Sequence, residues 1–221
     1  MRAILIGATG LTGGILLKQL LTDPVFSHVK IIGRRTTGVK HTKLEECIID
    51  FNDAAAFEQA TSGGDVLFCC IGTTQTKVKG DKTAYKKVDF DIAVNAARYG
   101  ARNGLSKFLL ISSVGANAAS SNFYLRLKGE TESAILSQPI NTVYIMRPSL
   151  LLGNRKEPRI AERIAQPVMQ FFSRFLIGDM ARYKAIDASE LASAMRAAAK
   201  ETTTGKFICS YVAIKKLCRK N

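Results

Sequence analysis

Short apolar runs recur along the chain and are separated by segments with helical spacing. The runs lie at residues 2–6, 29–33, 46–50, 66–71, 107–113 and 142–146, and helical spacing covers about 81–99 and 122–136. The unbroken run Val66–Ile71 is typical of a parallel strand that is covered on both faces. Strands that alternate with helical segments predict an α/β fold built on a doubly wound parallel sheet.

The pattern loosens after Pro148. Residues 161–177 have helical spacing, Phe207–Tyr211 is expected to form a late strand, and a short helix is expected to close the chain. We predict a single domain over residues 1–221, with a core at 1–152 and a small C-terminal cap at 153–221 that contributes substrate contacts. The apolar face of residues 167–177 favours an apolar substrate if this segment covers the site.

Three glycines follow the first strand at every third position and open a helix. In this arrangement Gly7 makes the tight turn, Gly10 leaves room for phosphates, and Gly13 lets helix and strand pack. The helix N-terminus adds unpaired N–H groups and a partial positive charge. The segment therefore predicts a dinucleotide site; the alternative is a glycine-rich turn without a ligand.

The end of the second strand indicates which dinucleotide binds. An NAD site usually has an acidic residue about 20 residues after the glycines, but this chain has Gly33-Arg34-Arg35 there. Guanidinium groups bind phosphate through paired, charge-assisted hydrogen bonds. We therefore expect NADP(H) rather than NAD(H), unless both arginines are merely solvated.

A second group of residues has the chemistry of a carbonyl reductase. Tyr124 and Lys128 lie four apart on one predicted helix face, shortly after Ser112 and Ser113 at a strand end. A nearby cation favours the ionised phenol, which can exchange a proton with an alkoxide, and a serine hydroxyl can hold the carbonyl oxygen. A second Tyr-x-x-x-Lys match, at Tyr211, has no such context and is expected to be a chance match.

Composition limits the partners. The net charge is +14, yet the basic residues are scattered and no nucleic-acid motif is present. Part of the charge could face nucleotide phosphates, and the rest could solvate the surface or attract polyanions nonspecifically. No run reaches the roughly 18 apolar residues of a membrane span, and the first apolar stretch ends at Gly7, so neither a span nor a signal peptide is expected.

Cysteines and histidines give no metal signal. The five cysteines lack metal spacing, and the adjacent Cys69 and Cys70 are expected to be reduced core thiols on opposite faces of a strand. His28 and His41 are expected to face solvent from polar loops. We expect a cytoplasmic protein without a metal.

Several segments together resemble the atypical short-chain dehydrogenase/reductase superfamily, and within it the Tat-interacting-protein-type oxidoreductases. The resemblance covers roughly residues 1–152 and lies in the segments Gly7–Gly13, Ile32–Arg35, Phe68–Thr74, Val88–Asp91, Ser112–Gly115, Ser121–Glu130 and Arg147–Ser149. It implies a Rossmann-like domain that binds NADPH.

The resemblance also implies a role for individual residues. By position, the cofactor would contact Gly7, Thr9, Gly10, Leu11, Thr12, Gly13, Arg34, Arg35, Asp50, Cys70, Ile71, Gly72, Thr73, Ser112, Tyr124, Lys128, Arg147, Pro148 and Ser149. Within this set Asp50 would face the adenine, and Tyr124 and Lys128 would form the acid–base pair. Ser113 would orient the carbonyl, with Ser112 as the second choice.

The chain departs from the superfamily at two places. Many members carry an asparagine in the helix before the fifth strand, where this chain offers Asp89 or Asn95. The C-terminal part is shorter than in sugar-nucleotide epimerases, which disfavours a bulky UDP-sugar substrate.

The sequence therefore predicts an NADPH-dependent carbonyl reductase acting on a small-molecule carbonyl substrate. The main alternative is an NADPH-binding regulatory or assembly factor that acts through a protein partner, because one fold can serve either purpose. An epimerase or dehydratase that retains NAD is a third reading. Whether the protein is a monomer or a homodimer stays open.

Overall fold

The computed structural model describes residues 1–73, 80–153 and 182–220. Within them, seven strands form one parallel sheet: β1 (Arg2–Ile6), β2 (His28–Gly33), β3 (Leu44–Ile48), β4 (Val66–Cys69), β5 (Lys107–Ile111), β6 (Thr142–Met146) and β9 (Gly205–Cys209). A separate short pair consists of β7 (Leu151–Leu152) and β8 (Ile186–Asp187).

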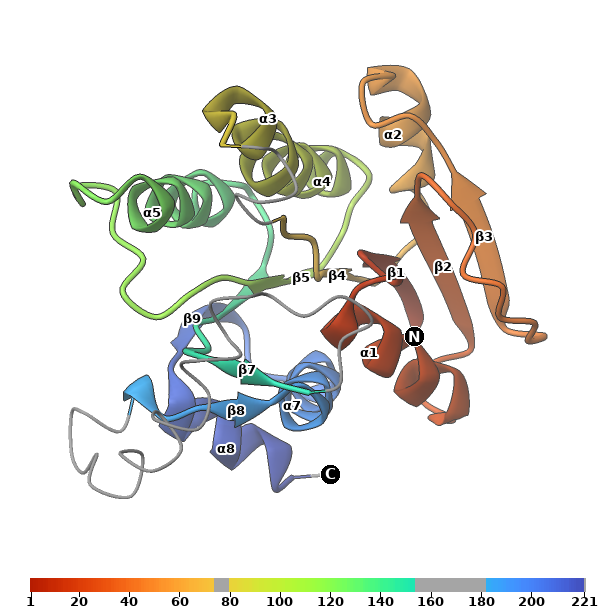
Figure 1. Ribbon diagram of the computed structural model, residues 1–221. Helices are drawn as coiled ribbons and strands as arrows, with labels where there is room; N and C mark the ends of the chain where they lie inside the picture. Colours follow the sequence, from red (N-terminus) through yellow and green to blue (C-terminus); the bar gives the residue numbers. More distant parts are fainter. Residues whose placement is uncertain (74–79, 154–181, 221) are drawn as a thin grey trace.

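The strand order in the sheet is β3-β2-β1-β4-β5-β6-β9 (Figure 1). The chain moves outward in one direction from β1 to β3 and then in the other from β4 onward. The order reverses between β1 and β4, and ligands of doubly wound sheets bind at this crevice, beyond the carboxyl ends of the strands. The predicted Rossmann-like α/β fold is confirmed.

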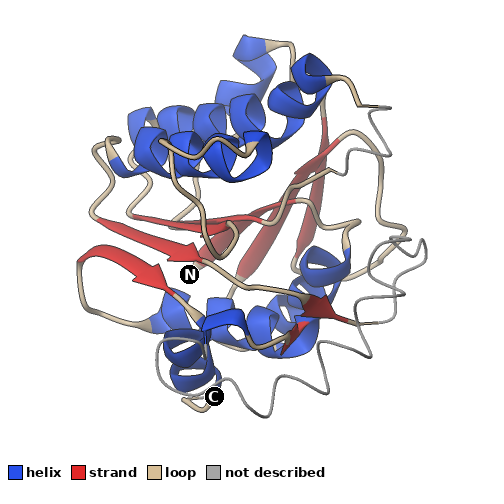
Figure 2. Cartoon of the chain, turned by 60° about the vertical axis from the view of Figure 1, so that its left-hand side comes forward, coloured by secondary structure: helices blue, strands red, loops and turns tan. Residues whose placement is uncertain are grey.

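Helices cover both faces of the sheet (Figures 1 and 2). On one face lie α1 (Leu11–Thr22), α7 (Ala188–Lys200) and α8 (Tyr211–Cys218). The other face carries α2 (Ala54–Ala60), α3 (Lys82–Lys86), α4 (Ile92–Arg102) and α5 (Phe123–Leu136). The π-helical turn η1 (Lys87–Asp91) joins α3 to α4.

Alternating residues of each strand supply the two cores. In β1, Ala3 and Leu5 face the α1–α7–α8 side, whereas Ile4 and Ile6 face the side of α2, α4 and α5. All four side chains are buried. Burial on both faces explains why the inner strands β1, β4, β5 and β6 are nearly continuous apolar runs rather than alternating patterns.

Several element boundaries differ from the sequence prediction, and two of the differences have a structural reason. The third strand is Leu44–Ile48, two residues earlier than predicted, and its residues are half-buried or exposed because β3 lies at the sheet edge. The predicted helix over residues 81–99 is interrupted by η1. A π-helical turn inside a helix often marks a functional site.

The C-terminal segment does more than cap the core. Residues of β9 pair with β6 in the main sheet, and α7 packs on α1, so the core does not end at residue 152. The described part of 153–221 therefore contributes an edge strand to the main sheet as well as helices to one of its faces. The predicted late strand ends at Cys209, and Tyr211 begins α8. The predicted helix at 161–177 lies outside the described residues.

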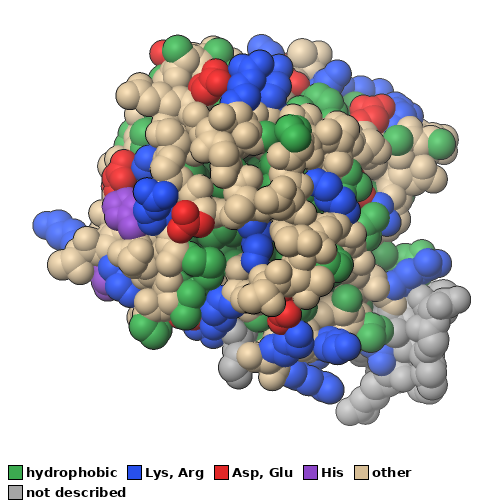
Figure 3. Space-filling model, turned by 180° about the vertical axis from the view of Figure 1, so that it is seen from behind, with side chains coloured by type: hydrophobic (Ala, Val, Ile, Leu, Met, Phe, Trp, Pro, Cys, Tyr) green, Lys and Arg blue, Asp and Glu red, His purple; other side chains and the backbone are tan. Residues whose placement is uncertain are grey.

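The surface carries its positive charge in many places. Figure 3 shows Lys and Arg side chains scattered over one face among other types. In the part of the chain that the structure describes, no helix is long and apolar enough to cross a membrane.

Candidate functional site

The glycine turn lies at the carboxyl end of β1, beside the loop that follows β4. Gly7 has φ +89°, and a Cβ there would lie 2.6 Å from the Cys70 carbonyl oxygen. A Cβ on Gly13 would lie 2.1 Å from the Gly7 carbonyl oxygen. Glycine is therefore required at both positions, for the backbone conformation at Gly7 and for close packing at each. The two loops meet at the switch point of the sheet.

The first turn of α1 is open to an anion. Its N-cap is Gly10, which has no side chain to cap the helix, and no acidic residue lies in the first turn. The first N–H groups of a helix have no intrahelical partner and attract negative charge. Thr9 and Gly10 are exposed, whereas Thr12 is buried. The turn fits the pyrophosphate of a dinucleotide.

The two predicted phosphate-binding arginines lie at the same sheet edge. Ile6 of β1 pairs with Ile32 of β2, which places Gly33 level with Gly7. Arg34 and Arg35 follow directly, and both are exposed. Asp50 is also exposed, in the loop after β3, where one carboxylate oxygen accepts hydrogen bonds from the backbone and side chain of Asn52.

Residues 70–73, which follow β4, are held by a carboxylate and by the core. The backbone N–H of Thr73 donates to Oδ2 of Asp89 over 2.8 Å. Cys69 packs into the core on the α4 side, and Cys70 packs against the α1 side, as expected from their adjacent positions. Burial raises the pKa of the Cys69 thiol to about 11, so it is protonated at neutral pH.

Lys128 forms a buried ion pair. Its Nζ lies 2.7 Å from Oδ1 of Asp89, and the two side chains are 6% and 1% exposed. Burial, the largest single effect, lowers the pKa of Lys128, but Asp89, Tyr124 and Cys69 together raise it above its ordinary value of 10.5. Asp89, rather than Asn95, is thus the residue of this helical segment that contacts the lysine.

Tyr124 lies between Lys128 and a second tyrosine. The Lys128 Nζ is 6.0 Å from the centre of the Tyr124 ring. The Tyr85 ring meets Tyr124 edge to face at 6.4 Å, and the Tyr85 hydroxyl donates to the Thr73 carbonyl over 3.2 Å. These contacts bring Tyr124 near the loop that follows β4.

The two candidate serines have different surroundings. Ser112 is buried, and its hydroxyl donates to the carboxylate of Glu132. Ser113 is half-buried, and its hydroxyl contacts only the carbonyl of the next residue, over 3.3 Å, among the described residues. Ser113 is therefore the more exposed of the two serines.

Arg147 is held by the same carboxylate. Its Nε lies 3.0 and 3.1 Å from the two Glu132 oxygens, and a further terminal nitrogen contacts one of them. Glu132 is 2% exposed. Pro148 is buried, and the Ser149 hydroxyl donates to the Lys184 carbonyl. The predicted Arg147–Ser149 segment is therefore bound at its first residue by Glu132 and at its last residue by the Lys184 carbonyl.

A cleft of about 570 Å³ opens beside Ser113, at the carboxyl ends of β5, β6 and β9. It is lined by Val114, Gly115, Ala116, Asn117, Arg147, Arg182, Tyr183, Ile208, Ser210 and Val212. Its place next to the candidate serine makes it a candidate substrate cleft.

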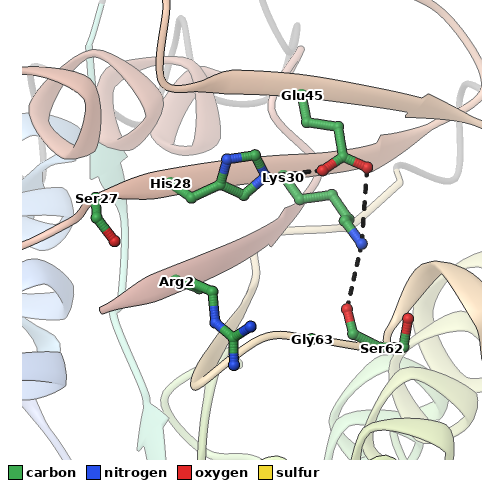
Figure 4. A pocket seen from close by; sticks show the side chains of 7 residues that line it. All are labelled: Arg2, Ser27, His28, Lys30, Glu45, Ser62 and Gly63. Carbon is green, nitrogen blue, oxygen red and sulfur yellow. Dashed lines mark hydrogen bonds and ion pairs between the residues drawn. The ribbon is translucent and has the colours of Figure 1, made fainter.

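A second hollow, of about 500 Å³, lies at the opposite edge of the sheet, where β1 and β2 begin (Figure 4). His28, at the start of β2 rather than in a loop, pairs with Glu45 at 2.7 Å. Lys30 reaches the Ser62 carbonyl and also Glu45. These groups satisfy one another, and no candidate catalytic residue lies there.

Sequence reasoning missed two residues of the site. Glu132 binds both Ser112 and Arg147, and Tyr85 contacts Tyr124. The signal for Glu132 was its position, because residues 124, 128 and 132 are spaced four apart and share a helix face. Tyr85 gave no comparable signal.

Comparison with known proteins identifies the family and the fold of this chain. A family model described as NAD(P)H-binding matches residues 7–170. The chain is 35% identical to Protein HTATIP2 of Rattus norvegicus over 165 residues, which cover 73% of this chain and 67% of that protein. It is 32% identical to Protein FMP52, mitochondrial, of Candida albicans, covering 76% and 75%.

Solved structures show the same fold at low sequence identity. The Bordetella bronchiseptica enzyme WbmH, in complex with NAD+, aligns with a TM-score of 0.70 at 17% identity, over 99% of this chain and 79% of that one. MoeE5, in complex with UDP-glucuronic acid and NAD, aligns with a TM-score of 0.73 at 14% identity, over 94% and 75%. At such identities the likeness shows the fold alone.

The expected cytoplasmic location is wrong on this comparison. The fungal relatives from Candida albicans, Aspergillus fumigatus and Scheffersomyces stipitis are all named mitochondrial, which conflicts with it. The features from which we expected it, a short first apolar stretch and reduced cysteines, do not distinguish the compartments.

The resemblance to short-chain dehydrogenases/reductases of the Tat-interacting-protein type is confirmed by these matches. The matched region contains the glycine turn, Asp89, Tyr124 and Lys128, and the sheet has the strand order of a dinucleotide-binding fold. The chain therefore belongs to the NAD(P)H-binding family within this superfamily.

Proposed function

We propose that this protein is an NADPH-dependent oxidoreductase of the carbonyl reductase type, acting on a small carbonyl or alcohol substrate. The observation that carries the proposal is the buried Lys128, held by Asp89 under the Tyr124 ring. A buried ammonium beside a phenol, at the ligand-binding edge of the sheet, is a costly arrangement that proton transfer would explain.

The cofactor preference rests on Arg34 and Arg35. Both are exposed at the carboxyl end of β2, level with the glycine turn. Within the described residues, neither arginine forms an ion pair with a carboxylate. They can therefore bind the 2′-phosphate of NADPH. The open first turn of α1 would hold the pyrophosphate, with Gly7, Gly10 and Gly13 allowing its approach.

When bound at the glycine turn, NADPH would supply the hydride that reduces the carbonyl carbon to the level of an alcohol. The Tyr124 hydroxyl donates its proton to the carbonyl oxygen as that oxygen becomes an alkoxide. The Ser113 hydroxyl donates a hydrogen bond to the same oxygen. The Lys128 ammonium stabilises the phenolate that Tyr124 becomes, and it can also hold the nicotinamide ribose.

A Tyr124→Phe variant tests the proposal. We expect turnover of a panel of small aldehydes and ketones with NADPH to be nearly abolished, while NADPH affinity stays within a few fold. Tyr211→Phe is the matched control, because Tyr211 belongs to the second Tyr-x-x-x-Lys match, on α8, where Lys215 pairs with Glu190. If Tyr124→Phe keeps its turnover, the proposed mechanism is wrong.

The second candidate is an NADPH-binding regulatory factor that acts through a protein partner. Two large apolar side chains on the candidate cleft, Ile208 and Val212, are 51% and 62% exposed, and a protein partner seated there would bury them. Tight NADPH binding without turnover on the whole panel would favour this function over the first.

A further inference from the structure

We propose that Asp89 is a positioning residue that keeps Lys128 charged and ties it to the backbone of the loop after β4. The inference rests on the proposed function only where it says that Lys128 serves the reaction. The contacts of Asp89 with Lys128 and Thr73 belong to the folded chain whatever its function. Asp89 holds the Lys128 ammonium close to Tyr124 and to the residues that follow β4, where the cofactor is proposed to bind.

Both oxygens of the Asp89 carboxylate are used. Oδ1 accepts from Lys128 at 2.7 Å, and Oδ2 accepts from the Thr73 N–H at 2.8 Å. The carboxylate is therefore fixed between a side chain of α5 and the backbone after β4. Gly72 lies against the same carboxylate, since a Cβ there would be 3.7 Å from Oδ1.

The loop is linked to Tyr124 by a second route. The Thr73 carbonyl accepts from the Tyr85 hydroxyl, and the Tyr85 ring packs edge to face against Tyr124. Thr73 thus binds Asp89 through its N–H and Tyr85 through its carbonyl. Thr73 is therefore connected to Lys128 through Asp89 and to Tyr124 through Tyr85.

Asp89 lies inside η1, and π-helical turns within α-helices often occur at functional sites. Asp89 is 2% exposed within this turn, whereas Asp91, two residues later, is half-buried and has no partner among the described residues. Only one of the two carboxylates of the turn is directed at the lysine.

The charge of Lys128 depends on this carboxylate. The groups that face its Nζ are Asp89 from η1, Tyr124 from its own helix and Cys69 from β4. The Cys69 thiol is neutral at neutral pH, because burial raises its pKa to about 11. Without Asp89, burial would lower the pKa of Lys128, and the lysine would lose its proton at a lower pH.

The test is an Asp89→Asn variant, compared with Asp91→Asn. Asparagine can still accept from the Thr73 N–H, but it cannot balance the charge of Lys128. The first measurement is the melting temperature of the ligand-free protein between pH 6 and 10. In the variant the unfolded chain binds its lysine proton more tightly than the folded one, so stability relative to wild type rises with pH.

We expect this pH-dependent difference in Asp89→Asn, not in Asp91→Asn, and we expect it to vanish when Lys128→Met is added. A purely structural role for Asp89 would lower the melting temperature equally at every pH. An equal loss at every pH, or a slope that survives Lys128→Met, would overturn the inference.

The second measurement is the dissociation constant for NADPH over the same pH range. We expect the affinity of Asp89→Asn to fall at least about tenfold more than that of wild type between pH 7 and 9. The two proposals fail separately. A protein that does not bind NADPH but shows the Lys128-dependent slope retains the positioning role and loses the proposed function. A protein with normal turnover, whose Asp89→Asn variant shows no pH-dependent difference in stability, retains the proposed function and loses the positioning role.

Discussion

A Cβ on Gly13 would lie 2.1 Å from the carbonyl oxygen of Gly7, closer than any side chain can approach a backbone. The first turn of α1 therefore rests directly on the glycine turn that it follows. This contact sets the distance between β1 and the helix N-terminus, and with it the space for a pyrophosphate.

Gly13→Ala should separate the helix from the turn. We expect the free energy of unfolding to fall by about 1–3 kcal/mol, since the backbone must move, and NADPH binding to be lost. Gly14→Ala is the matched control. Its Cβ would lie 3.2 Å from the Ala8 carbonyl oxygen, and alanine favours the helix by about 1 kcal/mol. Denaturant unfolding and NADPH titration of both variants check the prediction; equal effects would contradict it.

Arg34→Ala/Arg35→Ala should change cofactor preference without changing the fold. Each lost charge-assisted hydrogen bond is worth about 1.5–3 kcal/mol, so NADPH affinity should fall roughly tenfold or more, with NADH affinity unchanged. A thermal-shift titration measures both, since a ligand that binds the native form raises the melting temperature. Arg102→Ala is the control, because this exposed arginine of α4 pairs with Glu58 instead. A wild-type protein that prefers NADH would refute the prediction.

Glu132→Gln should destabilise the protein more than Glu130→Gln. Glu132 is buried and binds both Arg147 and Ser112, so its loss leaves a partly buried charge without a counter-ion and should cost about 3 kcal/mol. Glu130 is half-buried and lies 4.0 Å from Arg126, so its loss should stay within about 0.5 kcal/mol. Urea unfolding compares the two. Similar losses would mean that the Glu132 pair does not stabilise the fold.

Asp23 should make stability depend on acid pH. Burial raises its pKa, but the Val25 N–H, Lys200 and Arg196 outweigh this effect and hold the pKa below its ordinary value of 3.8. The folded state therefore gains stability above pH 3.8 and loses it as the pH falls through the lower, folded-state value. Asp23→Asn should lower the free energy of unfolding at pH 7 by about 1–3 kcal/mol. The difference from wild type should shrink below about pH 4, and a difference that persists at pH 2 would contradict this assignment.

The elements and the glycine turn could be predicted from local pattern. Apolar runs determine which segments become the inner parallel strands, because those strands are buried on both faces, and the spacing of Gly7, Gly10 and Gly13 is set by contacts within one turn. The edge strand β3 was misplaced by two residues for the same reason, since its residues are not buried on both faces and its apolar pattern is weak.

Tertiary structure alone decided which side chains meet. The sequence left the choice between Asp89 and Asn95 open, and it gave no sign that Ser112 binds Glu132, because both contacts depend on side chains of other elements. The π-helical turn, the Glu132–Arg147 pair and the place of β9 beside β6 likewise join segments that are distant in the chain. Periodicity reports which residues are buried, since burial repeats with the geometry of one helix or strand. It does not report the partner of a buried charge, which is set only when helices and strands pack.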